Sequence, residues 1–178
     1  MTVDVVKNMG ASVRQRLLNH AKASGRPFAE VLQYYAMERF LYRLSVSPHV
    51  ENFTLKGALL LTAWQAPISR PTMDIDLLGR TDNAVDTTVK VMREISQLVV
   101  PDDGISFNSA SFTGETIRDD ADYAGVRTVF AGRVDSAQVH MQIDIGFGDV
   151  MTPGPEVLRY PLCSTFPRRF SLDTAGRL

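Results

Sequence analysis

The sequence has little cysteine, little histidine and almost no net charge. Its single cysteine, Cys163, cannot form a disulfide within the chain, and the three histidines (His20, His49 and His140) are too scattered for a zinc motif. With a net charge of −1, no overall basic field predicts nucleic-acid binding, so any basic surface must be local. No apolar run approaches the roughly 20 residues of a membrane span, and none resembles a signal peptide. We therefore expect a cytoplasmic protein without a membrane partner.

What the chain does have is enough apolar sequence for one substantial core. It is 178 residues long, and 44% of them are hydrophobic. We expect an N-terminal helical segment over 1–50 that packs on the core, and a central domain over 51–155. The remaining residues, 156–178, show no long amphipathic pattern, and we expect them to form an irregular tail.

Two helices are predicted in the N-terminal segment, over 12–24 and 28–44. Apolar residues recur there at helical spacing, and Gly25 ends the first helix. Arg39 and Arg43 share a face of the second helix. A solvated face with extended arginines is the favoured interpretation, and contact with the phosphates of a nucleotide or RNA is the alternative.

A glycine turn follows a short β-prone stretch, 53–55. The sequence continues through Lys56, Gly57 and Ala58 into an apolar run, 58–64, that predicts a buried helix. The N-terminus of such a helix offers backbone N–H groups and a positive dipole end to a phosphate. A glycine can also be required in a strand–helix turn for steric reasons alone.

Two acids, Asp74 and Asp76, lie in a stretch that predicts a strand from Met73 to Leu78. In a strand, Met73, Ile75 and Leu77 would point one way and the two acids the other, with their Cα atoms roughly 6–7 Å apart. Like charges this close repel unless a proton or a cation neutralises them. A hard divalent ion with oxygen ligands would do so.

An Asp-x-Asp triplet alone is weak evidence. The chain contains 14 Asp residues, so chance would produce about one such triplet, and a second one does occur at Asp120 and Asp122. That second triplet lies in a polar stretch, which we interpret as a solvated loop. Asp74 and Asp76 differ because apolar residues surround them in the sequence. A charge in such surroundings is energetically unfavourable unless it is paired or binds a ligand.

A third acid lies farther along. An amphipathic helix is predicted over 84–99, and two strands over 123–131 and 139–147, joined by a hairpin. Asp144 lies in the second strand, on the face opposite to its apolar side chains. If that strand neighbours the first acidic strand, three carboxylates meet, as in sites where two metal ions promote phosphoryl transfer. The alternative for Asp144 is a cross-strand ion pair with Arg127, and His140 is interpreted as an ordinary surface residue.

Several motifs together resemble the AbiEii/AbiGii nucleotidyltransferase toxin family. They lie at 38–44, 55–58, 70–77, 123–127 and 143–149, and the resemblance covers about 14–155. It implies an α/β (α+β) fold of the DNA polymerase β type, with a mixed β-sheet flanked by helices and an N-terminal helical pair. It also implies site residues: Asp74, Asp76 and Asp144 as catalytic and metal ligands, and Lys56, Gly57, Ala58, Arg70 and Thr72 as nucleotide-binding residues.

The same resemblance implies an activity. The expected reaction is a transfer of NMP from an NTP to an acceptor, the 3′ end of tRNA, with Mg²⁺ or Mn²⁺ as cofactor. The setting would be a toxin–antitoxin (abortive infection) system, with a cognate antitoxin as partner. Family members continue into a helical C-terminal region, so we expect this chain to be truncated. Two alternatives remain open: a remnant that only binds nucleotide or antitoxin, and a metal-dependent phosphohydrolase.

Overall fold

The computed structural model describes residues 8–60, 71–118, 124–148, 155–160 and 170–174. Three complete α-helices lie in these ranges, α1 (Met9–Ser24), α2 (Phe28–Ser45) and α4 (Val85–Ser96), together with two short 3-10 helices, Val50–Asn52 and Ser109–Ser111. The strands are β1 (Phe53–Lys56), β2 (Ile75–Gly79), β3 (Ile105–Phe107), β4 (Thr113–Arg118), β5 (Ala124–Val134), β6 (Ala137–Phe147), β7 (Glu156–Tyr160) and β8 (Phe170–Thr174). None of the helices in the described part of the chain is long and apolar enough to span a membrane.

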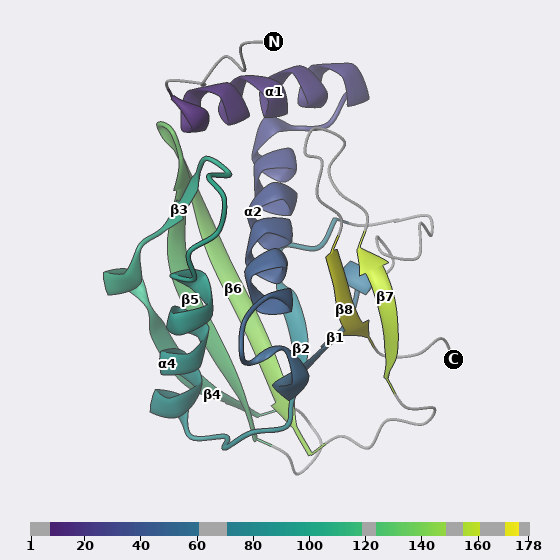
Figure 1. The fold of residues 1–178 in the computed structure, drawn as a ribbon, viewed down its shortest axis with the longest axis vertical. Coiled ribbons are helices and arrows are strands. Elements are labelled where there is room, and N and C mark those ends of the chain that lie inside the picture. Colours follow the sequence, from purple (N-terminus) through teal and green to yellow (C-terminus); the bar gives the residue numbers. More distant parts are fainter. Residues whose placement is uncertain (1–7, 61–70, 119–123, 149–154, 161–169, 175–178) are drawn as a thin grey trace.

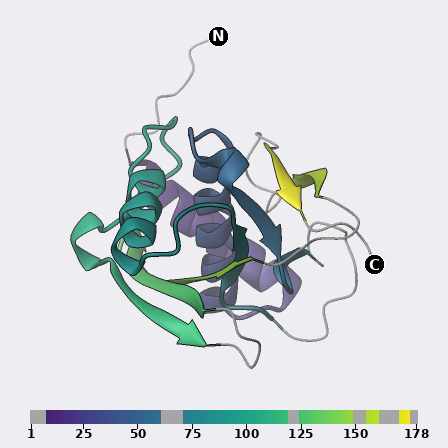
Figure 2. The ribbon, with the colours of Figure 1, turned by 90° about the horizontal axis from the view of Figure 1, so that it is seen from below.

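The eight described strands form one mixed sheet in the order β3-β5-β6-β2-β1-β8-β7, and β4 pairs with β5 beside β3. The β2–β6 and β1–β8 pairs are parallel, and the other pairs are antiparallel. Helices α2 and α4 contact each other and pack on the same face of the sheet, and α1 crosses the end of α2 (Figures 1 and 2). The expected α+β class, with a mixed sheet, flanking helices and an N-terminal helical pair, is confirmed.

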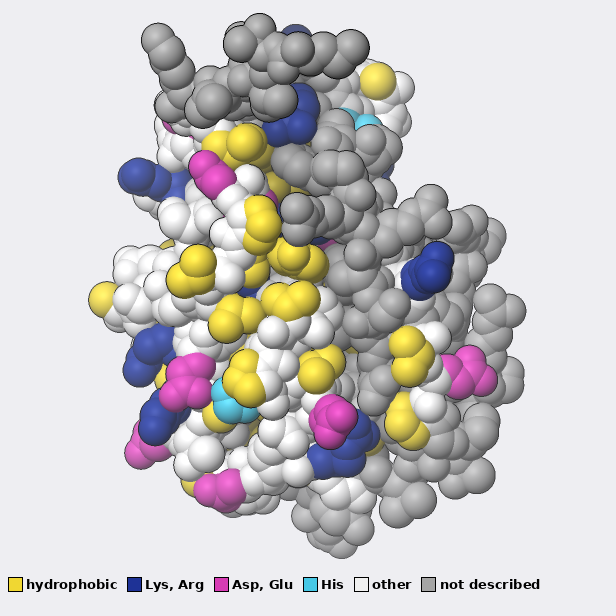
Figure 3. Space-filling model, in the orientation of Figure 1, with side chains coloured by type: hydrophobic (Ala, Val, Ile, Leu, Met, Phe, Trp, Pro, Cys, Tyr) yellow, Lys and Arg dark blue, Asp and Glu magenta, His cyan; other side chains and the backbone are white. Residues whose placement is uncertain are grey.

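The core lies between this helical layer and the sheet. Phe40 of α2 packs at 5.7 Å (centroid to centroid) from Phe130 of β5, which stacks on Phe112 at 4.1 Å and meets Phe107 edge-on at 5.5 Å. Aromatic pairs of this kind add to the stabilisation from buried area. On the helix-covered face of the molecule, the described charged side chains of both signs are interspersed with hydrophobic ones (Figure 3).

Both predicted N-terminal helices exist, with small shifts at their ends. Helix α1 begins three residues early because the Asn8 side chain accepts a hydrogen bond from the Ala11 N–H. It stops where predicted, since Gly25 adopts a left-handed conformation with φ of 68°. Helix α4 ends at Ser96, so Val99, expected on its apolar face, is instead 96% exposed.

The interpretation of Arg39 and Arg43 as a solvated face was wrong. Both arginines are buried, and neither reaches out toward solvent as a phosphate contact would. Arg43 donates two hydrogen bonds to the Asp103 carboxylate, at 2.7 and 3.1 Å, and Arg39 pairs with Glu38 at 2.6 Å. The hydroxyl of Tyr35 donates to the backbone carbonyl of Asp103. This face of α2 therefore anchors the turn before β3.

Two predictions for the strands also need correction, and one strand was missed. Strand β2 begins at Ile75, and Met73 is 53% exposed instead of sharing the buried face of Ile75 and Leu77. The tail 156–178, expected to be irregular, contains β7 and β8, and β8 joins the central sheet through the pairing of Leu55 with Thr174. Strand β4 was not predicted.

Some predicted features fall partly or wholly outside the described residues. Leu59 and Leu60 are helical and buried, as expected for the start of the helix over 58–64, but its remainder is not described. The second acidic triplet and Arg70 also lie outside the described residues.

We expect Asp103→Asn to destabilise the protein by about 3 kcal/mol or more, because it leaves the Arg43 charge buried without its counter-charge. Urea unfolding followed by circular dichroism would measure this. The matched control is Asp102→Asn, since Asp102 is exposed and only caps the Gly104 N–H, which an Asn oxygen can also do. The control should stay within about 0.5 kcal/mol of the stability of wild type. If Asp103→Asn loses no more stability than Asp102→Asn, the anchoring role is contradicted.

Candidate metal centre

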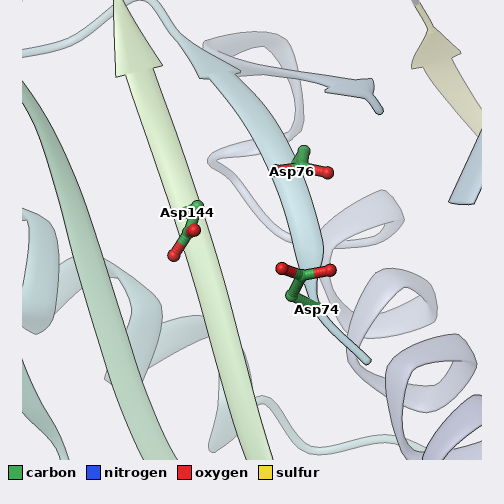
Figure 4. A group of neighbouring side chains, drawn as sticks. All are labelled: Asp74, Asp76 and Asp144. Atoms are coloured by element: carbon green, nitrogen blue, oxygen red, sulfur yellow. The ribbon is translucent and has the colours of Figure 1, made fainter. Parts of the chain in front are cut away.

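Three carboxylates converge on the face of the sheet away from the helices. Asp76 of β2 and Asp144 of β6 are register partners in the parallel pair, and Asp74 directly precedes β2. One oxygen from each acid lies within 4.8 Å of one from each of the others (Figure 4). All three side chains are partly buried. The predicted meeting of acids from two distant segments is therefore observed, whereas their roles remain predictions.

Alternation along β2 and β6 explains why the acids face this way. Ile75 and Leu77 on β2, and Ile143 and Ile145 on β6, are fully buried on the helix side. Successive side chains of a strand point to opposite faces, so the intervening acids face away from the helices. A shift of one residue in either strand would exchange the two sets.

Helix α2 fixes where the two acidic strands lie relative to each other. The buried amide of Gln33 donates to the carbonyl of Met73 at 2.9 Å and to that of His140 at 3.0 Å, which ties the start of β2 to β6. The Tyr34 hydroxyl accepts from the Thr72 N–H at 3.2 Å. Sequence reasoning missed both residues. The available signal was a glutamine on the face of α2 that is otherwise apolar.

Thr72 orients one of the acids directly. Its hydroxyl donates to an oxygen of Asp74 at 2.7 Å. The sequence placed Thr72 near the nucleotide through the family resemblance. In the structure Thr72 is not one of the three acids, but its hydroxyl holds the Asp74 carboxylate through this hydrogen bond.

Basic side chains flank the acids on both sides. The register pairs Lys56 of β1 with Asp76, and Arg127 of β5 with Asp144. Lys56, Asp76, Asp144 and Arg127 therefore form one row across four strands, which we call the charged row. Arg127 donates to both oxygens of Asp144, at 2.8 and 2.7 Å. Asp144 is therefore both a member of the acidic group and the ion-pair partner of Arg127, so the two arrangements do not exclude each other.

Gly57 brings the turn after β1 directly against the triad. Its φ is 74°, a left-handed conformation that side chains disfavour. A Cβ atom built on Gly57 would lie 2.0 Å from Asp76 Oδ2, so only glycine lets the backbone approach this carboxylate. The exposed Ala58 follows. The position of this turn is consistent with a phosphate site that is adjacent to the acids.

Burial of Asp76 and repulsion between the acids have a measurable consequence. The pKa of Asp76 is raised from 3.8 to about 6, first by burial and then by the neighbouring charges of Asp74 and Asp144, while Lys56 and Arg127 oppose the rise. A divalent cation would remove this penalty, because carboxylate oxygens are ligands that Mg²⁺ and Mn²⁺ favour. The donor set, its spacing and its charge therefore fit a divalent metal ion.

Other features of the described residues do not join this site. His140 is exposed and does not belong to the acidic group. A hollow of about 450 Å³ lies at the carboxyl ends of β2 and β6, lined by residues such as Gly79, Arg80 and Phe147, but none of the three acids lines it. The candidate site thus rests on the triad and not on the size of a cavity.

The metal-free protein is expected to lose stability as the pH rises from about 4 to about 6. In this range folded Asp76 keeps its proton whereas unfolded Asp76 releases it, so the raised pKa stabilises the fold only at lower pH. Thermal unfolding of wild type and Asp76→Asn between pH 4.5 and 7 would isolate this contribution. The melting temperature of wild type should fall relative to the variant over this range, and Mn²⁺ at pH 7 should reverse the fall. A difference between the two proteins that is independent of pH would contradict the shifted pKa.

Comparison with known proteins bears on this geometry. A family model described as "Nucleotidyl transferase AbiEii toxin, Type IV TA system" matches residues 39–175, a range that includes all three acids. Neither a search of curated proteins nor a search of solved structures found a significant match. Because the family match covers more than half of the chain, the chain belongs to the AbiEii nucleotidyl transferase toxin family of type IV toxin–antitoxin systems.

Proposed function

We propose that this protein is a metal-dependent nucleotidyltransferase that transfers NMP from an NTP to the 3′ end of a tRNA, and that a cognate antitoxin restrains it in the cytoplasm. The observation that carries the proposal is the convergence of Asp74, Asp76 and Asp144 beside the Gly57 turn. Family membership supports the reaction class and the antitoxin partner. The tRNA acceptor rests on the family resemblance of the sequence motifs.

Each group in the site has an assigned role. Asp74, Asp76 and Asp144 would hold Mg²⁺ or Mn²⁺, which when bound neutralises phosphate charge and makes the acceptor hydroxyl more acidic. Thr72 keeps the Asp74 carboxylate in place. The turn of Lys56, Gly57 and Ala58 would receive the triphosphate, with the lysine charge and the backbone as its contacts. We also retain Arg70 as a proposed nucleotide contact.

The transfer forms one bond and breaks another. The acceptor oxygen attacks the α-phosphorus of the NTP, the bond from that phosphorus to the bridging oxygen breaks, and pyrophosphate leaves as the hydroxyl proton is lost. Such reactions depend mainly on positioning and on stabilisation of charge. A rigid pair of strands that presents three acids is suited to that task.

The direct test is incubation with each of four labelled NTPs, total tRNA and Mg²⁺. We expect label on tRNA with wild type, and at least a 100-fold lower rate with Asp76→Asn, because a neutral amide removes a charged ligand. The control is Asp135→Asn, since Asp135 lies in the exposed β5–β6 turn at a left-handed φ of 52° that Asn tolerates. Release of phosphate without transfer would favour the phosphohydrolase, and nucleotide binding without turnover would favour the binding remnant.

Gly57→Ala is expected to weaken both Mn²⁺ and nucleotide binding at least tenfold, because its methyl group would collide with the Asp76 carboxylate. Calorimetric titration would measure both affinities. Gly25→Ala is the matched control, since Gly25 has a similar φ of 68° but no atom within 4 Å of its added Cβ. Both variants should lose about 1 kcal/mol of stability from backbone strain. Equal binding by the two variants would show that Gly57 serves only the turn.

A further inference from the structure

Arg127 occupies the position that decides whether Asp144 is available to a metal ion. Its guanidinium donates to both oxygens of Asp144, at 2.8 and 2.7 Å, and the amide of Gln142 approaches the same two oxygens at 3.3 Å. A cation that binds the triad must share these oxygens with a group that is already positively charged. Arginine and metal ion therefore compete for Asp144, both for its lone pairs and through repulsion between their charges.

The arginine has room to change partner. The Arg127 side chain is 35% exposed, whereas that of Asp144 is 16% exposed. Its register partners are Asp144 on one side and the exposed Glu115 of β4 on the other, and Lys56 lies on the far side of Asp76. Two cationic groups thus bracket Asp76 and Asp144 on the face of the sheet away from the helices. A phosphate chain that crosses the acids would meet a basic side chain at either end.

We propose that Arg127 is an exchangeable counter-ion: it neutralises Asp144 while no metal is bound, and it contacts the phosphates of the nucleotide once a metal ion takes Asp144. This inference rests on the proposed function and extends it by one nucleotide-binding residue. Arginine suits the second role because its planar fork matches phosphate oxygens as well as carboxylate oxygens. Metal ion and nucleotide would then assist each other, since the ion releases the arginine that the phosphates need.

A purely structural ion pair is the competing explanation. Partly exposed pairs of this kind contribute little to stability, typically less than about 1 kcal/mol. If Arg127 only held Asp144 in position, its removal would leave the acid misplaced, and the metal ion would bind more weakly. If Arg127 competes, its removal leaves the acid free, and the metal ion binds more tightly. The two explanations predict opposite signs.

The test is titration of metal-free wild type and Arg127→Gln with Mn²⁺ in the absence of nucleotide. We expect the variant to bind Mn²⁺ at least fivefold more tightly. A second titration at saturating Mn²⁺, with a non-hydrolysable NTP analogue, should show at least tenfold weaker binding to the variant. The control is Arg133→Gln, because Arg133 is exposed on the same face of β5, six residues or about 20 Å farther along, and should change neither affinity.

Every outcome decides the inference. Unchanged or weaker Mn²⁺ binding by Arg127→Gln, unchanged binding of the analogue, or absence of Mn²⁺ binding by both proteins would overturn it. Equal changes in the Arg133→Gln variant would overturn it too, because the effect would then reflect overall charge. Failure of the proposed function looks different: the expected opposite shifts in the two affinities would still occur, but no acceptor would be labelled by wild type.

Discussion

Mutual repulsion of three carboxylates is the constraint that the rest of this structure serves. Nothing in a sheet favours holding Asp74, Asp76 and Asp144 within a few ångströms of one another, and this repulsion adds to burial, the larger cause, in raising the pKa of Asp76. Apolar burial on the other face of the same two strands offsets it. Four isoleucine and leucine side chains there are fully buried, and each such burial contributes about 1.5–3 kcal/mol. The strands that carry the acids are thus held in place by side chains on the opposite face of the sheet, which do not contact the site.

The parallel pairing of β2 and β6 brings the acids of the two buried strands next to each other. Parallel strands need a long connection, and here β3, β4 and β5 lie between them in sequence. Gln33 then fixes the pairing from outside the sheet, because one amide serves a carbonyl at the start of β2 and another on β6. A slip of β2 against β6 would forfeit these hydrogen bonds and bury the acids, so register and function depend on the same contacts.

Sequence could predict what is local, and it failed where partners are distant. Alternation correctly placed Asp76 and Asp144 opposite their apolar neighbours, but their adjacency came only from the family resemblance. Helical spacing grouped Arg39 with Arg43 yet could not indicate burial, because Asp103, the partner of Arg43, lies 60 residues away. Strand β8 has one partner of each kind: β7 lies in the same tail, whereas β1 lies more than 100 residues earlier. Nothing local to the tail reveals the pairing with β1, which joins the tail to the central sheet.

The charged row also explains why the net charge of the chain carried no functional signal. Together with Asp74, the acids of the row outnumber the basic residues Lys56 and Arg127, so without a metal ion these five side chains as a group repel a polyanion. A single bound dication reverses the sign, while the charge of the rest of the protein stays unchanged. Because neighbouring charges on a partly exposed face act within about 10 Å at ordinary salt, this local reversal would govern the approach of the proposed triphosphate and RNA substrates. For these proposed substrates an overall basic surface would be unnecessary, and affinity for both anions would be conditional on the metal ion.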